Sequence, residues 1–134
     1  MPNSYVVLDN GALVVEHWTG TVTHDELISH ERDQINDRTI KPGAAVLAYA
    51  ADATFETGQE EVHELSGLYG RNDISMEKCA VVVNDDAYDR AQLFAAQGAG
   101  YGMSIVVFND IDSACEWLAV DPAEIKSQLK ALKT

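Results

Sequence analysis

Cysteine, proline and positive charge are scarce in this chain of 134 residues. Two cysteines are too few for a disulfide framework, and three prolines with nine glycines argue against a disordered or fibrous chain. Nine basic residues stand against 22 acidic ones, which gives a formal net charge of −13 at pH 7. Such a surface repels phosphate backbones and anionic lipid headgroups, so nucleic acid and membrane surfaces are poor partners.

Long hydrophobic runs are missing as well. No segment approaches the ~18 apolar residues of a membrane span, and the N-terminal stretch MPNSYVVLDNG lacks the basic and long apolar regions of a secretory signal. We therefore expect a cytoplasmic protein without membrane insertion. Cys79 opens an apolar run and Cys115 lies on an apolar helical stripe, so both are expected to be small core residues rather than reactive thiols.

Recognisable catalytic and metal-binding motifs are also lacking. No G-x-S-x-G or S-x-x-K nucleophile motif occurs, and the histidines His17, His24, His30 and His63 contain no i, i+4 pair typical of a helical zinc site. The glycine-rich stretch 98–102 follows a predicted helix and precedes a predicted strand, the reverse of the order in a phosphate-binding loop. We expect no enzyme activity, no metal and no cofactor.

What the sequence does contain is a regular succession of strand and helix signals. Asn10-Gly11 is typical of a tight turn and predicts an antiparallel hairpin of residues 5–8 and 12–18. Further strands are predicted at 44–50, 78–84 and 103–109, and helices at 24–36, 58–69, 85–98, 110–120 and from Pro122 onward. The order ββαβαβαβαα predicts an α/β fold with a mixed, mostly parallel sheet, in one domain over residues 1–134.

Acidic side chains follow three of the predicted parallel strands. They lie in the loops 50–57, 84–86 and 109–112 and are Asp52, Glu56, Asp85, Asp86, Asp110 and Asp112. Carboxyl ends of parallel strands meet at one edge of a sheet, so a pocket for a divalent cation is one interpretation. Helix capping is the other, and we favour it because each loop opens a predicted helix.

Thr57, in the stretch FETG before the helix predicted at 58–69, also has two interpretations. With Glu60 it has the spacing of a capping box, which stabilises a helix start without any regulation. As a regulatory hydroxyl, it would place a phosphate at a helix N-terminus and change any interface built around it.

Trp18 and Trp117 are the only tryptophans in the chain. Large aromatic residues at strand and helix positions are typical of core or dimer contacts, which favours the first interpretation of this pair. The second is that they line an apolar pocket for a small ligand. The apolar hairpin edge and these two side chains together also allow a homodimer.

The element order and the stretch FETG resemble the STAS domain of bacterial anti-sigma-factor antagonists, whose corresponding loop reads approximately F-x-D-S-S-G. Phe55 and Gly58 match the two ends of that loop. The resemblance places Thr57 at the position phosphorylated by a partner kinase and Glu56 near the acidic position, with Thr54 just before the matched stretch. This chain departs from the pattern in having a shorter loop without serine.

The stretches GALVVEHWTG and VVFNDIDSACEWL are similar to the related small bacterial STAS/SEC14-like, or SpoIIAA-like, proteins. Their pattern F-x-D-x-x-x-A-x-x-W-L is matched by Phe108, Asp110, Ala114, Trp117 and Leu118. The resemblance covers nearly the whole chain, and members mostly lack an assigned activity. It implies a SpoIIAA-like, non-catalytic regulatory module that binds a protein partner. Kinship with SEC14 lipid carriers implies the alternative, a carrier or sensor of a small apolar ligand at Trp18 and Trp117.

Overall fold

The computed structural model of this chain describes residues 3–56, 78–99 and 104–132. Thr57, Gly58 and the helix predicted at 58–69 lie outside these residues, and so do positions 100–102 of the glycine-rich stretch.

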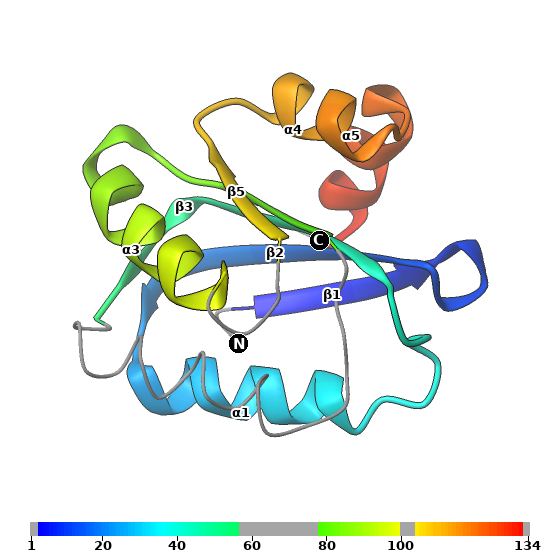
Figure 1. Cartoon of the computed structure of the whole chain (residues 1–134), viewed down its shortest axis with the longest axis horizontal. Helices are drawn as coiled ribbons and strands as arrows, with labels where there is room; N and C mark the ends of the chain where they lie inside the picture. The colour runs from blue at the N-terminus through cyan, green and yellow to red at the C-terminus, as the bar shows by residue number, and fades with distance from the viewer. Residues whose placement is uncertain (1–2, 57–77, 100–103, 133–134) are drawn as a thin grey trace.

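Five strands among the described residues form one sheet in the order β1-β2-β3-β4-β5 (Figure 1). β1 (Asn3–Leu8) runs antiparallel to β2 (Leu13–Val22), while β3 (Ala45–Phe55), β4 (Lys78–Val82) and β5 (Ser104–Phe108) extend the sheet by parallel pairing. The prediction of a mixed, mostly parallel sheet that starts with an antiparallel hairpin is confirmed.

The turn between β1 and β2 requires glycine at one position. Asp9, Asn10 and Gly11 all have positive φ angles, of 52°, 56° and 95°. A Cβ atom on Gly11 would lie only 2.3 Å from the carbonyl oxygen of Thr39. The Asn-Gly pair therefore marks the turn, as predicted, because few other residues adopt these angles.

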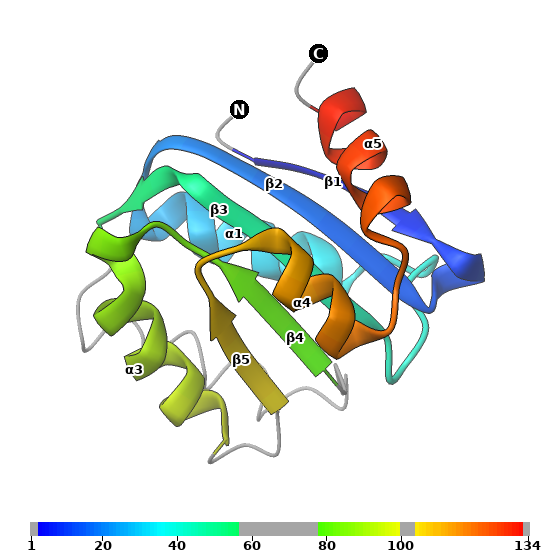
Figure 2. The same ribbon diagram turned by 90° about the horizontal axis from the view of Figure 1, so that it is seen from above.

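Helices cover both faces of the sheet. α1 (His24–Ile35) and α3 (Tyr88–Ala99) pack on one face, and α4 (Ile111–Leu118) and α5 (Pro122–Leu132) pack on the other (Figures 1 and 2). Burial on both faces explains why the strands are apolar over continuous runs rather than at alternate positions.

β2 and β3 are longer than predicted. β4 pairs with β3 only as far as Tyr49 and Val82, whereas β2 and β3 stay paired from Thr19 and Asp52 to Val22 and Phe55. We call residues 19–22 and 52–55 the overhang. The predicted loop 50–57 is therefore mostly strand, and the expectation that Asp52 lies in a loop opening a helix is wrong.

Side-chain caps begin the described helices where the sequence suggests. Thr23 and Glu26 form the predicted capping box of α1, and the Asp110 carboxylate accepts a hydrogen bond from the Ser113 N–H at the start of α4. Pro122 is the first residue of α5, directly after Asp121. In the described ranges, no helix is long and apolar enough to cross a membrane.

Candidate functional site

The overhang has one buried and one exposed face. Val22 and Ala53 are buried in the core beneath α1 and α3. The neighbouring positions in each strand are exposed and form two cross-strand pairs, Thr19 with Asp52 and Thr21 with Thr54. Paired residues of parallel strands share a face, so these four side chains form one continuous polar surface. We call it the overhang face.

A histidine lies at the base of the overhang face. His17 pairs with Tyr49 across the strands, and their rings stack with centroids 6.0 Å apart. An irregularity in the β2–β3 pairing after His17 brings the Asp52 carboxylate to 3.7 Å from His17 Nε2. The His17 side chain is 6% exposed and that of Asp52 is 51% exposed, so a buried histidine lies next to a half-exposed carboxylate.

The overhang face continues into an acidic edge where the parallel strands end. The Glu56 N–H donates to the Val22 carbonyl at 2.9 Å, and the Glu56 side chain is exposed. The Asn84 side-chain amide donates to the Ala51 carbonyl at 3.2 Å and holds the end of β4 against β3. Asp85 and Asp86 follow Asn84 and are exposed.

Most of the acidic side chains at this edge have structural roles or are solvated. Asp110 caps α4, and Asp112 forms an exposed ion pair with Lys126 at 2.9 Å. Asn84, rather than Asp85 or Asp86, caps the short 3-10 turn that precedes α3. Among the residues that the structure describes, no three His, Cys, Asp or Glu side chains are grouped to hold a metal ion.

The structure exposes two of the four residues that the sequence suggests for phosphate acceptance or partner contact. Thr54 lies on the overhang face and Glu56 directly follows the overhang. Thr57 and Gly58 are the next two residues along the chain and lie outside the described ranges. Their assignment stays a prediction.

Trp18 and Trp117 pack in different core clusters, on opposite faces of the sheet. Trp18 is 2% exposed and belongs to the core beneath α1, where its indole packs 4.5 Å from the His30 ring. Trp117, on α4, packs 6.0 Å from the Phe108 ring, and Lys78 Nζ lies 5.2 Å from its centroid.

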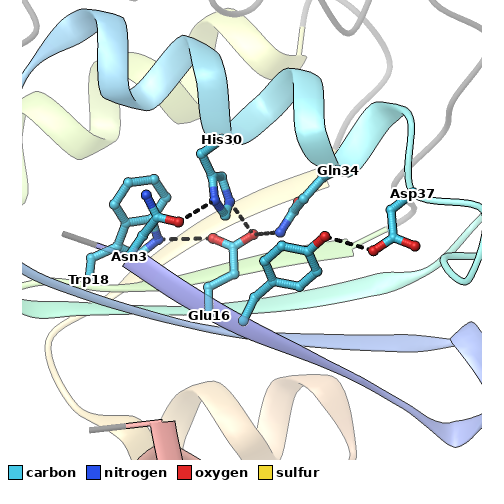
Figure 3. A network of polar contacts seen from close by, with 7 residues as sticks. Asn3, Glu16, Trp18, His30, Gln34 and Asp37 are labelled. Atoms are coloured by element: carbon cyan, nitrogen blue, oxygen red, sulfur yellow. Dashed lines mark hydrogen bonds and ion pairs between the residues drawn. The ribbon is translucent and has the colours of Figure 1, made fainter. Parts of the chain in front are cut away.

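A buried polar network joins β2 to α1 (Figure 3). The Glu16 carboxylate, 4% exposed, accepts hydrogen bonds from the Trp18 indole at 3.0 Å and from the Gln34 amide at 2.6 Å. His30 Nε2 lies 3.1 Å from the same carboxylate, while His30 Nδ1 lies 2.9 Å from the Asn3 side-chain oxygen. Three partners from three elements, Asn3 of β1, Trp18 of β2 and Gln34 of α1, thus surround the buried pair of Glu16 and His30.

The network shifts the pKa of its members in the directions expected for an ion pair. Burial alone would raise the pKa of Glu16, but the His30 charge and the surrounding hydrogen bonds outweigh it and lower that pKa. Burial alone would lower the pKa of His30, but Glu16 outweighs it and raises that pKa to about 9. Glu16 and His30 are therefore both charged at neutral pH.

Comparison with known proteins supports the fold but names no activity. No protein-family model matches the chain, and no curated protein matches it. Among solved structures, the chain is similar to an uncharacterized protein of the DUF3478 family with a SpoIIAA-like fold from Shewanella loihica PV-4, with a TM-score of 0.55. The two share 11% sequence identity over 87% of this chain and 93% of the other. The fold is SpoIIAA-like. At this identity the similarity shows the fold alone.

Sequence reasoning missed the two sites that this SpoIIAA-like domain displays. The helical stripe predicted for residues 24–36 is weak because His30, Glu31 and Gln34 occupy buried positions of α1, where apolar residues are expected. Their spacing toward one side of the helix is the signal that points to a buried polar face. The overhang face gave no comparable signal, because it depends on how far β2 and β3 stay paired.

Proposed function

We propose that this SpoIIAA-like domain is a non-catalytic regulatory module of the cytoplasm that binds a protein partner through the overhang face. The observation that carries the proposal is the exposed pairing of Thr19 with Asp52 and of Thr21 with Thr54, at the sheet edge that leads into Glu56 and Thr57. The partner is expected to present hydrogen-bond donors and positive charge, since Asp52, Glu56 and the net charge of −13 favour them.

Two further features support an interaction role over catalysis. The polar side chains at this edge that have partners are used for capping or for strand contacts, as with Asp110 and Asn84. Cys79 and Cys115 are buried, and burial raises the pKa of both thiols, which keeps them protonated. In the described part of the chain, neither cysteine offers a reactive nucleophile.

Position-specific cross-linking tests the proposed surface. A photoreactive amino acid is placed at Thr21, at Thr54 or, as a control, at Ser127, an exposed hydroxyl position on α5. We expect one and the same partner to be cross-linked from Thr21 and Thr54 and not from Ser127 in the native host. Asp52→Lys in the same chains is expected to abolish that adduct, because it reverses the charge of the surface.

The result that would refute the proposal is an equal adduct pattern from Ser127, or no adduct at all from the overhang face. An adduct of the chain with itself identifies the partner as a second copy, which is the homodimer that the sequence allows. Binding of the purified partner to wild type and to Asp52→Lys then gives the affinity difference directly.

The regulatory half of the proposal concerns Thr57. The resemblance to anti-sigma-factor antagonists supports it, as does its position one residue after Glu56. Thr57→Glu is expected to weaken the cross-link from Thr54 and Thr57→Ala to retain it, with a mass heavier by one phosphate found only in chains that keep Thr57. Equal cross-linking and equal masses for all three chains would leave Thr57 as a helix cap.

A further inference from the structure

The contact between α1 and the sheet contains more buried charge than a structural contact requires. His30, Glu31 and Gln34 of α1 are 3%, 7% and 2% exposed. His30 and Gln34 contact Glu16 of β2, which is 4% exposed. No lysine or arginine is buried among the residues that the structure describes. The other buried histidine, His17, stacks on Tyr49, which packs against the core beneath α4 and α5. Among the described residues, His30 is therefore the buried cation in contact with Glu16 on the α1 face.

Glu16 and Glu31 differ in how their oxygens are satisfied. Both Glu16 oxygens have close partners, from Trp18, Gln34 and His30. Glu31 Oε2 is buried and has no hydrogen-bond partner in the described part of the structure. A buried carboxylate oxygen without a partner disfavours the ionised form, so the closed structure favours a protonated Glu31.

Titratable groups on four elements act on this cluster. Tyr5 of β1 packs edge-on against the His30 ring, with centroids 5.8 Å apart, and it interacts electrostatically with Glu16. Glu16 of β2 and His30 act on Glu31, and Asp33 of α1 acts on His30.

Cys79 of β4 also interacts with this cluster. Burial is the main cause that raises its pKa well above the ordinary value, and Glu16 and Glu31 raise it further. Among these groups only His30 is positively charged. Its charge favours an ionised Glu31, but burial together with the charge of Glu16 outweighs it and raises the Glu31 pKa.

We propose that Glu16, His30 and Glu31 form a proton-dependent clasp that holds α1 on the sheet and weakens as the pH rises through neutrality. The closed clasp is balanced, with one negative charge on Glu16, one positive charge on His30 and a neutral Glu31. This device is independent of the overhang face as a docking surface, although α1 begins two residues after β2 ends.

The direction of the pH effect follows from proton release on opening. Burial raises the pKa of Glu31 from 4.5 to about 8, and the charge of Glu16 overcomes burial to raise that of His30 from 6.5 to about 9. When α1 opens, water returns both groups to their ordinary values. Opening therefore releases the Glu31 proton between pH 4.5 and 8 and the His30 proton between pH 6.5 and 9.

The two ranges overlap between pH 6.5 and 8, where opening releases both protons. There the population of the open form rises by up to about a hundredfold per pH unit. Glu16 changes the stability of the clasp only in acidic solution. Its pKa is lowered in the closed form, so opening takes up a proton at Glu16 only below its ordinary value of 4.5. The clasp is therefore tightest in mildly acidic solution.

Native-state amide hydrogen exchange tests the clasp. Protection factors, corrected for the intrinsic pH dependence of exchange, are measured for α1 and for the central strand β3 in wild type, Glu31→Gln and Asp112→Asn. In wild type and Asp112→Asn, α1 is expected to be less protected than β3, and its protection should fall more than tenfold per pH unit between pH 6.5 and 8. In Glu31→Gln the fall is expected to be about tenfold smaller per unit, since only His30 releases a proton.

Two outcomes overturn the proposal. The first is the same pH dependence of α1 protection in Glu31→Gln and wild type. The second is α1 protection equal to that of β3, which means that α1 opens only when the whole sheet unfolds. Carbon-13 NMR of the Glu31 carboxyl in wild type gives a reading that needs no variant: a midpoint near 8 is expected, and one near 4.5 refutes the clasp.

Discussion

At the scale of single residues, the chain offers two ion pairs of nearly equal length in opposite environments. Glu16 and His30 are 3.1 Å apart and buried, whereas Asp112 and Lys126 are 2.9 Å apart and more than half exposed. Removing one member of a buried pair strands the other charge, while an exposed pair is screened by water and salt. Their lengths therefore say little about their contributions to stability.

Glu16→Gln is expected to lower the free energy of unfolding by about 3–5 kcal/mol, because it leaves the His30 cation without its counter-charge in the core. Urea denaturation followed by Trp18 fluorescence, in a Trp117→Phe background, measures this loss. The matched control Asp112→Asn is expected to change stability little. Equal losses in the two variants would show that the Glu16 network is no stronger than a surface contact.

The β2 side of the network could not be predicted from the sequence, for a physical reason. In a strand covered on both faces, burial does not alternate, so the position of Glu16 among Leu13, Val14 and Val15 indicates neither face nor depth. Two of its partners, His30 and Gln34, lie on α1, and Asn3 of β1 contacts His30. Only the packed structure brings these elements together. Trp18 is buried and its indole N–H donates to Glu16, while its assignment as a ligand contact stays a prediction.

At the scale of elements, strand and helix identity could be predicted and strand length could not. The core segments of all five strands follow from apolar runs and turn signals. The overhang was missed because Gly20 and the run Ala-Asp-Ala-Thr at 51–54 have low strand propensity, and their pairing is held by backbone hydrogen bonds and by burial of Val22 and Ala53. The candidate docking surface therefore lies on the part of the sheet that the sequence did not predict.

The start of α1 gives a prediction at this scale. The Thr23 hydroxyl accepts a hydrogen bond from the Glu26 N–H at 3.2 Å, and Glu26 Oε1 accepts one from the Thr23 N–H at 3.1 Å. Thr23→Ala is expected to cost about 1 kcal/mol in urea denaturation, because it removes the cap that joins the overhang to α1. Thr23→Ser keeps the hydroxyl and is expected to stay close to wild type. A loss of similar size in Thr23→Ser would assign the effect to the methyl group instead.

At the scale of the whole molecule, surface charges and buried charges affect stability in different ways. The surface has a net charge of −13, and its repulsion acts through water, where salt screens it. The buried groups Glu16, His30 and Glu31 act inside the protein, where salt screens them far less. Salt and pH therefore separate the two contributions.

The free energy of unfolding is expected to fall by about 1–3 kcal/mol per pH unit between pH 6.5 and 8, because His30 and Glu31 hold protons in the folded chain that the unfolded chain releases. Below pH 4.5 it is expected to fall again as Glu16, whose pKa is lowered by folding, takes up a proton. Urea denaturation across this pH range, at low salt and at about 1 M salt, measures both slopes.

Salt is expected to raise the whole curve by reducing surface repulsion. It should leave the slope between pH 6.5 and 8 unchanged, since His30 and Glu31 are buried and salt screens them far less. Glu31→Gln supplies the matched comparison, because it removes one of the two protons and leaves the surface charge intact. A slope that vanishes in high salt, or that persists unchanged in Glu31→Gln, would place the pH dependence on the surface and not in the contact between α1 and the sheet.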